Sequence, residues 1–381
     1  MTLSRRKTLA LIGGGTLFAA TGAFAYDVTR PADAALAPWR TAGTYNDPRL
    51  KAFSWAILAP NPHNQQPWLL ELRGDAQAVL TVNPAKLLPH TDPFSRQITI
   101  GLGCFLELAR MAALADGFDM QIDLFPEGSD AAALDGRPVA VCTFVAAEAQ
   151  RDPLLDHVHD RRSLKEPYDT TRRVPNSAIG VMQASASAGS TFGSTLDDGD
   201  IELFRAFTTE ALLVEIETPR TFKESVDVFR IGRDEVNANP DGIDFTGPLF
   251  ETLSRFGMFT RQAALDTSSA AYTQGITAVT DNTETAMGYI WLKTAGNTRQ
   301  EQIMAGADWI RVNLAATGIG LAMQPLSQAL QEYPEMAAHY TELHDRLAPE
   351  GSTLQMFARI GYGPQTAQSP RWPIDAKVVH A

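Results

Sequence analysis

The sequence predicts an α+β protein that consists of two related halves and an N-terminal export segment. Of its 381 residues, 44% are hydrophobic and 20% are charged, as is typical of a folded globular protein. This length suits two modest domains or one large one, because a single hydrophobic core stops growing near ~250–300 residues. The order of helix, glycine and β segment occurs twice along the chain, which indicates a duplication. The net charge of −12 argues against a nucleic-acid surface as the main function.

Residues 1–25 have the pattern of an export signal. Three cations, Arg5, Arg6 and Lys7, precede an apolar run of 17 residues that ends at Ala25. The run is shorter than the ~20 residues that span a bilayer, so no stable membrane anchor is expected. The residues around the two arginines resemble a twin-arginine signal, which is an address read by the export machinery. This resemblance implies a periplasmic or otherwise exported protein that folds, with any cofactor, before export.

Each half is predicted to contain two helices followed by β structure. In the first half, residues 26–150, the apolar spacing predicts helices over 48–60 and 104–118 and strands over 120–125 and 139–145. In the second half, residues 151–381, it predicts helices over 174–187 and 303–323 and a strand over 354–363. Gly117 and Gly318 are expected to stop the two long helices. Aligning these glycines superimposes the two halves.

The second half contains an insertion, about residues 218–290, that has no counterpart in the first half. It is too long and too amphipathic for a plain loop. Pro240, Gly242 and Pro248 divide it, so it is predicted to consist of short helices. We expect this segment to form a lid or a small helical subdomain.

Each half carries a polar motif that the other half lacks. In the first half, the helix is followed directly by Asn61-Pro62-His63-Asn64-Gln65-Gln66-Pro67-Trp68. In the second half, the helix is preceded by Arg161-Arg162-Ser163-Leu164-Lys165. The two motifs therefore predict one site to which both halves contribute.

These motifs resemble those of the nitroreductase-type flavoproteins, and specifically those of their duplicated, Acg-like branch. In the ordinary, unduplicated members of this family, two identical subunits build each FMN site. One supplies Arg-x-Ser-x-Arg/Lys and a C-terminal arginine, and the other supplies Ala-Pro-Ser-x-x-Asn-x-Gln-Pro-Trp. Here the matching residues are 161–165, Arg371 and 59–68, and the resemblance covers most of residues 45–375. Asn61 replaces the usual serine, so this position lacks the hydroxyl.

The resemblance implies a nitroreductase-like fold in which the two halves form an intramolecular pseudo-dimer. Each half would contribute an antiparallel sheet and helices, and the chain would be a monomer with one FMN site. The implied cofactor-binding residues are Pro60, Asn61, Asn64, Gln66, Arg161, Ser163, Lys165, Gly318, Gly320 and Arg371. No side chain would be catalytic, because the chemistry takes place at flavin N5.

The chemistry of these side chains agrees with an FMN site. FMN carries a phosphate dianion and a ring whose N1/O2 edge becomes anionic on reduction, so it needs cations at two places. Arg161 and Arg371 suit the phosphate as fork donors, while Lys165 suits the N1/O2 edge. Ser163 would add a hydroxyl to the phosphate or the ribityl chain.

Uncharged groups would complete the predicted site. Asn64 and Gln66 carry both donors and acceptors, as do the ribityl chain and the pyrimidine. Gly318 and Gly320 would let backbone N–H groups approach N5, because glycine has no Cβ.

Each motif also has a purely structural interpretation. Residues 161–165 could be a solvated basic helix end. Asn64 and Gln66 could cap a helix and satisfy a proline-rich turn. Arg371 could be a solvated arginine near the terminus. His63 fits a group near the flavin or a turn histidine equally well.

Other chemistries find little support in the sequence. Cys104 and Cys142 lie in apolar stretches and are expected to be buried free thiols. His157 and His159 are two residues apart, whereas metal pairs on a helix favour a spacing of three or four, so no metal site is expected. No Gly-x-Ser-x-Gly motif of a serine hydrolase is present.

The function expected from the sequence is that of an exported FMN-dependent oxidoreductase. It would reduce an electron-poor small molecule, such as a quinone or a nitroaromatic, by two-electron ping-pong chemistry. The electron donor is unknown, because NAD(P)H is scarce outside the cytoplasm. Two alternatives remain: a protein that binds and sequesters FMN without turnover, and a flavin-free ligand-binding or scaffold protein.

Overall fold

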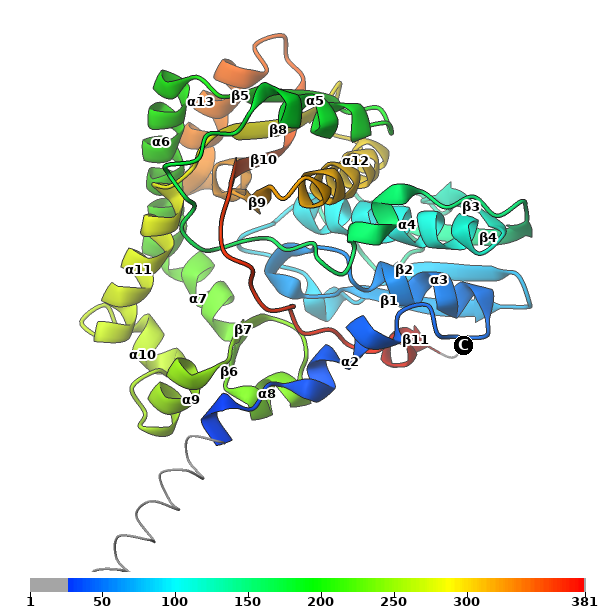
Figure 1. Cartoon of the computed structure of the whole chain (residues 1–381), viewed down its shortest axis with the longest axis horizontal. Helices are drawn as coiled ribbons and strands as arrows, with labels where there is room; N and C mark the ends of the chain where they lie inside the picture. The colour runs from blue at the N-terminus through cyan, green and yellow to red at the C-terminus, as the bar shows by residue number, and fades with distance from the viewer. Residues whose placement is uncertain (1–26, 380–381) are drawn as a thin grey trace, which may run out of the picture.

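The computed structural model describes residues 27–379, so the predicted export segment lies outside the described residues. The predicted α+β class is confirmed, since helices and two main sheets alternate along the chain (Figure 1). The first half contributes α2 (Asp33–Thr41), α3 (Pro48–Ala56), β1 (Trp68–Arg73), β2 (Gln77–Val82), α4 (Arg96–Ala115), β3 (Phe118–Leu124) and β4 (Ala140–Ala146).

From α3 onward, the second half repeats the order of one helix, two strands, one helix and two strands, with α13 as an additional helix. It contributes α5 (Asn176–Ser185), β5 (Thr191–Thr195), β8 (Tyr289–Thr294), α12 (Arg299–Gly318), β9 (Ala322–Pro325), α13 (Ala337–Leu347) and β10 (Thr353–Gly361). The strands of the first sheet are ordered β1-β2-β4-β3, and those of the second β5-β8-β10-β9. All these neighbours pair antiparallel. Because each strand has a counterpart at the same place, the two halves share one topology.

The C-terminal segment crosses from the second half to the first. After β10 the chain returns to the first sheet, where β11 (Val378–Val379) pairs in parallel with β1. The register places Val378 opposite Leu70. The first sheet therefore has five strands, one of which belongs to the second half.

The two long helices, α4 and α12, lie side by side at the centre of the molecule (Figure 1). Both have 20 residues and both begin at an arginine, Arg96 and Arg299. Arg96 donates to the carbonyl oxygen of Leu330 in the second half at 2.6 Å, and Arg299 donates to that of Asp130 in the first half at 3.0 Å. The two arginines thus make reciprocal contacts across the interface between the halves.

This helix pair corrects the alignment expected from the sequence. Gly318 is the last residue of α12, but α4 ends at Ala115, and Gly117 lies beyond it with φ 86°. Matching the helices by their first arginines places Ala115 on Gly318. Gly117 is instead a left-handed residue after the helix, where glycine is favoured.

Local sequence signals explain where the main helices begin. α3 starts at Pro48, behind Asp47, whose carboxylate accepts from the Arg49 N–H. α12 starts behind Thr298, which forms a capping box with Glu301. These caps satisfy backbone donors that no intrahelical carbonyl can reach.

The core lies around α4 and α12. Of the described helices, only α4 is long and apolar enough to cross a membrane, and 83% of its apolar window is buried inside the protein. The predicted buried free thiols are confirmed: Cys104 and Cys142 are both buried and unpaired. Burial raises the pKa of each to about 12.

The segment between β5 and β8 replaces the tight β1–β2 turn of the first half. It contains α6 (Asp198–Glu217), α7 (Pro219–Asp227), β6 (Phe229–Ile231), α8 (Arg233–Ala238), β7 (Ile243–Phe245), α9 (Pro248–Arg255), α10 (Arg261–Leu265) and α11 (Ala270–Thr283). By this comparison the extra segment, residues 196–288, begins before residue 218 and includes α6. The sequence suggested helices only, but β6 and β7 also form a two-stranded parallel sheet.

Candidate functional site

The loop between α3 and β1 has an unusual backbone. His63, Asn64 and Gln66 have positive φ values of 45°, 50° and 48°, although none is glycine. Such residues cost free energy and are concentrated at functional sites. The Asn61 side chain holds the loop in shape, because its Oδ1 accepts from the Gln66 N–H at 2.8 Å. This contact gives Asn61 a structural role, and a flavin contact of Asn61 or of the adjacent, half-buried Pro60 stays a prediction.

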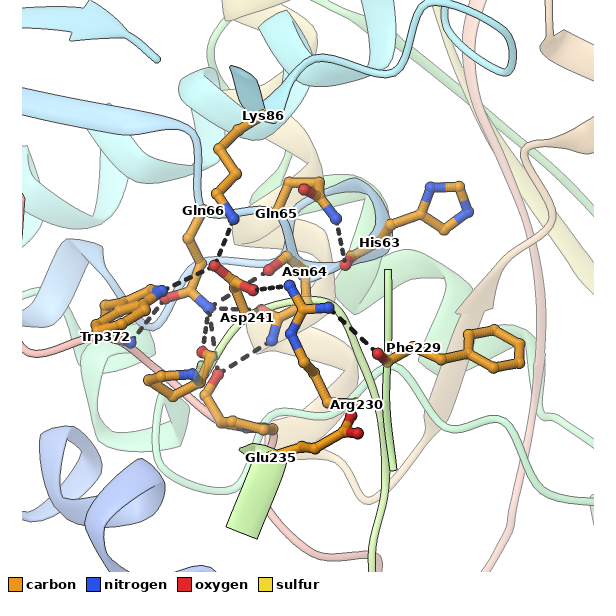
Figure 2. A network of polar contacts seen from close by, with 12 residues as sticks. His63, Asn64, Gln65, Gln66, Lys86, Phe229, Arg230, Glu235, Asp241 and Trp372 are labelled. Carbon is orange, nitrogen blue, oxygen red and sulfur yellow. Dashed lines mark hydrogen bonds and ion pairs between the residues drawn. The ribbon is translucent and has the colours of Figure 1, made fainter. Parts of the chain in front are cut away.

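Gln66 ties this loop to two distant segments. Its fully buried side chain donates from Nε2 to the Pro240 carbonyl oxygen at 2.7 Å, and its Oε1 accepts from the Trp372 N–H at 2.9 Å (Figure 2). Its carbonyl oxygen accepts from Lys377 Nζ at 2.6 Å. The amide already has partners at both ends, so the predicted contact of Gln66 with a flavin stays a prediction.

The structure buries Arg371, although it lies close to the end of the chain. The residue is 2% exposed, so its interpretation as a solvated terminal arginine is wrong. Its Nη1 donates to Asn64 Oδ1 at 2.7 Å, and its Nη2 donates to the Ala59 carbonyl oxygen at 3.2 Å. These contacts bring the C-terminal arginine and the predicted Asn64 together.

Arg161 approaches the same place from the other half. It is 3% exposed, and its Nη2 donates to the Leu58 carbonyl oxygen at 3.3 Å. Arg371 Nη2 also reaches this oxygen, at 3.4 Å. The burial of Arg161 contradicts its interpretation as part of a solvated basic helix end. Residues of the two polar motifs therefore meet across the interface between the halves.

The two guanidinium groups carry buried charge without a carboxylate partner among residues 27–379. Arg161 Nε and Nη1 and Arg371 Nε are buried and lack any hydrogen-bond partner within this range. Burial lowers the pKa of Arg161 to about 10, and burial together with repulsion from Arg161 lowers the pKa of Arg371 to about 9. Burying unpaired charge is costly. An anion with several acceptor oxygens would satisfy both groups, and a phosphate fits this requirement.

Lys165, four residues after Arg161 in the sequence, is exposed to solvent. Surrounding protein atoms nevertheless desolvate its ammonium group, which lowers its pKa, while the nearby acids Asp244 and Glu215 favour the charged form. Ser163 is half-buried, and its hydroxyl makes no hydrogen bond to the described part of the chain. Both side chains are thus available to a ligand, and their predicted contacts with FMN stay predictions.

Gly318 lies beside the segment that leads into the Arg-x-Ser-x-Lys motif, and Gly320 follows it two residues later. A Cβ at Gly318 would collide with His157, and the Leu164 N–H donates to the Met323 carbonyl oxygen at 2.9 Å. Gly320 has φ 73°, which favours glycine. The chain needs glycine here for close approach and for the turn. The predicted approach of their N–H groups to flavin N5 stays a prediction.

The histidines considered as metal ligands point to separate neighbours. His157 lies against Gly318, while the His159 ring lies 5.1 Å from the Trp55 ring, centroid to centroid. Within the described range, no cluster of three His, Cys, Asp or Glu residues could hold a metal ion.

The sequence did not single out the residues by which the insertion contacts this site. Asp241 is 1% exposed and accepts from Lys86 at 2.7 Å, from Arg230 at 2.6 Å and from Trp372 at 2.9 Å (Figure 2). The Gly242 N–H donates to the Asn64 carbonyl oxygen at 3.1 Å. Within this contact, only Pro240 and Gly242 gave a signal in the sequence. That signal predicts a turn, but it does not indicate which loop the turn contacts.

The sequence of this chain is similar, at low identity, to those of several known proteins. No protein-family profile matches the chain. The chain is 23% identical over 324 residues to "Putative NAD(P)H nitroreductase Rv3131" of Mycobacterium tuberculosis, covering 82% of this chain and 84% of that protein. It is 29% identical over 120 residues to "Putative NAD(P)H nitroreductase acg" of the same organism, covering 31% and 36%. These similarities support the nitroreductase-like superfamily as the coarse class of the chain.

Among solved structures, the chain is similar to two nitroreductases. One is NfnB from Mycobacterium smegmatis in complex with NADPH, with 20% identity, a TM-score of 0.33, and coverage of 57% of this chain and 92% of that one. The other is a nitroreductase with bound FMN from Bacteroides fragilis, with 13% identity, a TM-score of 0.33, and coverage of 57% and 91%.

Proposed function

We propose that this protein binds one FMN between its two halves and uses it as an oxidoreductase. The observation that carries the proposal is the convergence of the buried guanidinium groups of Arg161 and Arg371, with three buried nitrogen atoms that have no partner within residues 27–379. A phosphate dianion would neutralise this charge and accept the unused hydrogen bonds. The names of the relatives, NAD(P)H nitroreductases, support the same cofactor class.

Five of the predicted residues would have a part in holding the cofactor. Arg161 and Arg371 would bind the phosphate, and Asn64 would orient Arg371 through its Oδ1. Ser163 would add a hydroxyl, and Lys165 would place its charge at the N1/O2 edge, where it favours the reduced form. When bound, FMN supplies a centre that accepts and donates a hydride.

The proposed reaction is the two-electron reduction of a quinone or a nitroaromatic. The relatives' names make NAD(P)H the first electron donor to test. If the N-terminal segment directs export, as its arginine pair suggests, a different reductant must serve outside the cytoplasm. We propose a periplasmic or otherwise exported location on this basis.

A second candidate function is the storage of FMN without turnover. The observation that favours it is the set of contacts from the insertion, where Pro240 and Gly242 bond to the strained loop. A closed insertion would exclude substrates as well as water. Storage predicts a bound flavin that does not exchange electrons with small molecules.

The test begins with the full chain purified from the cytoplasm of the cells that produce it. The oxidoreductase predicts a yellow protein whose flavin, reduced chemically, is reoxidised rapidly by quinones or nitroaromatics. A bound flavin that resists reoxidation would favour storage. A colourless protein that takes up no added FMN would exclude both functions and favour a flavin-free ligand-binding or scaffold protein.

A further inference from the structure

A chain of polar side chains runs from the insertion to the strained loop. Ser225 on α7 lies between Glu215 and His63: its Oγ is 3.3 Å from Glu215 Oε1 and 3.3 Å from His63 Nε2. Gln331 fixes the far end, because its Nε2 donates to Glu215 Oε2 at 2.8 Å. Glu215 and Ser225 are 6% and 7% exposed. The chain therefore connects a buried carboxyl group to the imidazole through one hydroxyl.

The other end of the imidazole is unused. His63 Nδ1 is buried and has no hydrogen-bond partner within residues 27–379. His63 lies in the loop that also carries Asn64, and its ring points away from the Gln66–Trp372 network (Figure 2). Since the backbone holds His63 at a positive φ of 45°, the loop geometry keeps the ring in place at a cost in free energy.

The charged groups around Glu215, Ser225 and His63 change the pKa values of the imidazole and of the carboxyl group in opposite directions. Burial, together with the positive charge of Lys165, lowers the pKa of the His63 imidazole to about 4. Burial raises the pKa of Glu215, and Glu224 raises it further. Burial raises the pKa of the nearby Tyr333 phenol, and the charge of Glu215 raises it further. The carboxyl group therefore holds a proton more readily than an ordinary glutamate, and the imidazole remains neutral at neutral pH.

We propose that Glu215, Ser225 and His63 deliver the proton that the reduced acceptor requires. This inference depends on the proposed oxidoreductase function and adds three residues that the family motifs do not specify, since His63 occupies a variable position of its motif. A neutral imidazole can accept a proton at Nε2 while it donates one from Nδ1. The unpartnered Nδ1 is the atom from which the proton would leave.

The step balances for a quinone. The quinone gains a hydride, which carries two electrons, from the reduced cofactor of the proposed function, and it gains a proton from His63. One O–H bond forms at a quinone oxygen as the Nδ1–H bond of His63 breaks. Ser225 returns a proton to Nε2, and Glu215 replaces the proton of Ser225. The quinone is reduced to a hydroquinone, and solvent reprotonates Glu215.

Two acceptors separate proton delivery from electron transfer. Ferricyanide accepts electrons but no proton, whereas a quinone needs both. In the FMN-loaded protein, Ser225→Ala is expected to slow reoxidation by a quinone by up to about a hundredfold and to leave reoxidation by ferricyanide unchanged. Ser225→Thr keeps the hydroxyl and is expected to restore the quinone rate and its pH profile. Ser254→Ala, which removes a hydroxyl elsewhere on the insertion, is the matched control.

A second measurement uses the FMN-free protein. The nitrogen chemical shifts of the His63 imidazole report which nitrogen carries the proton, and Ser225→Ala is expected to change this tautomer ratio. If the shifts and the quinone rate both equal those of wild type, the proton-delivery proposal is wrong while the proposed function stands. Equal slowing with both acceptors would also overturn the proton-delivery proposal, because Glu215, Ser225 and His63 would then affect electron transfer. A protein that binds no FMN would overturn the proposed function itself.

Discussion

Gly103 on α4 and Gly306 on α12 face each other at the centre of the interface between the two halves. A Cβ built on Gly103 would lie 2.9 Å from the Cα of Gly306, and one built on Gly306 would lie 2.8 Å from the Cα of Gly103. Each would also collide with a carbonyl oxygen of the opposite helix, that of Ile303 or Ile100. The contact is thus reciprocal, as expected when two copies of one element meet about a two-fold axis.

This close approach predicts that alanine is not tolerated at either glycine. Gly103→Ala and Gly306→Ala should each lower the free energy of unfolding by about 1–3 kcal/mol or more, because backbone atoms must move. Urea unfolding of the purified variants measures the change. Gly180→Ala is the control, since Gly180 lies in α5 with no neighbour within 4 Å of its Cβ position. It should be neutral or slightly stabilising. Tolerance of alanine at both central positions would contradict the close packing.

Arg161→Ala and Lys165→Ala should weaken the FMN site by different routes. Loss of a charge-assisted contact to phosphate costs about 1.5–3 kcal/mol, which is roughly a tenfold to hundredfold loss of affinity. Loss of Lys165 should instead lower the reduction potential of bound FMN, because a cation favours the anionic reduced ring. Fluorescence titration and spectroelectrochemistry measure the two effects. Normal affinity and potential in both variants would mean that these residues do not contact the cofactor.

The histidine of the strained loop should make the protein sensitive to acid. The pKa of His63 is lowered from 6.5 to about 4 in the folded protein. As the pH falls through this range, the unfolded state binds a proton that the folded state does not, so the free energy of unfolding falls. His63→Gln should reduce this loss of stability. Urea unfolding across the same range measures it, and His90→Gln, at an exposed position, is the control. Identical pH dependence in His63→Gln and wild type would contradict the lowered pKa of this imidazole.

Much of the fold could be predicted because its signals are local. Apolar spacing predicted much of α4 and α12, although it missed the first turns of α4 and extended the second helix to residue 323, within β9. The repeated order of elements indicated two halves. The exact superposition could not be predicted, since Gly117 lies after its helix and Gly318 within its own. β11 was also missed, because two residues that pair with a distant strand leave no periodic pattern.

The candidate site shows the same division between local and long-range information. The motifs predicted Arg161, Asn64 and Arg371, which the structure brings together. Glu215 and Ser225 gave no signal, because their role depends on the path of the insertion in space. Gln66 was predicted to contact a flavin, yet its side chain bonds to backbone groups of the insertion and the C-terminal segment.

The fused halves predict a monomer in solution. The interface that joins two subunits in the related flavoproteins would lie within one chain here, as the reciprocal contacts of Arg96 and Arg299 indicate. Light scattering measures the mass. Mixing Asn64→Ala with Arg161→Ala is expected to restore no FMN binding, since each chain carries one defective site. Recovered binding in the mixture would reveal exchange of halves between chains and contradict the intramolecular site.

The second, equivalent position between the halves is not expected to bind FMN. The loop after α5 is closed by Asp308, a fully buried carboxylate on α12 that accepts from the Ala188 N–H at 2.6 Å and the Ser190 N–H at 2.7 Å. A buried negative charge there would repel a phosphate. One site per chain follows.

The number of FMN molecules released per chain on denaturation tests the central claim most directly. Wild type and the surface variant Arg151→Met should each release about one FMN per chain after saturation, because one pair of buried arginines, Arg161 and Arg371, would hold the phosphate of the cofactor. Arg371→Met should release far less at the same FMN concentration. Two FMN per chain would contradict the single site, and equal FMN in Arg371→Met and wild type would contradict the role of the paired guanidinium groups.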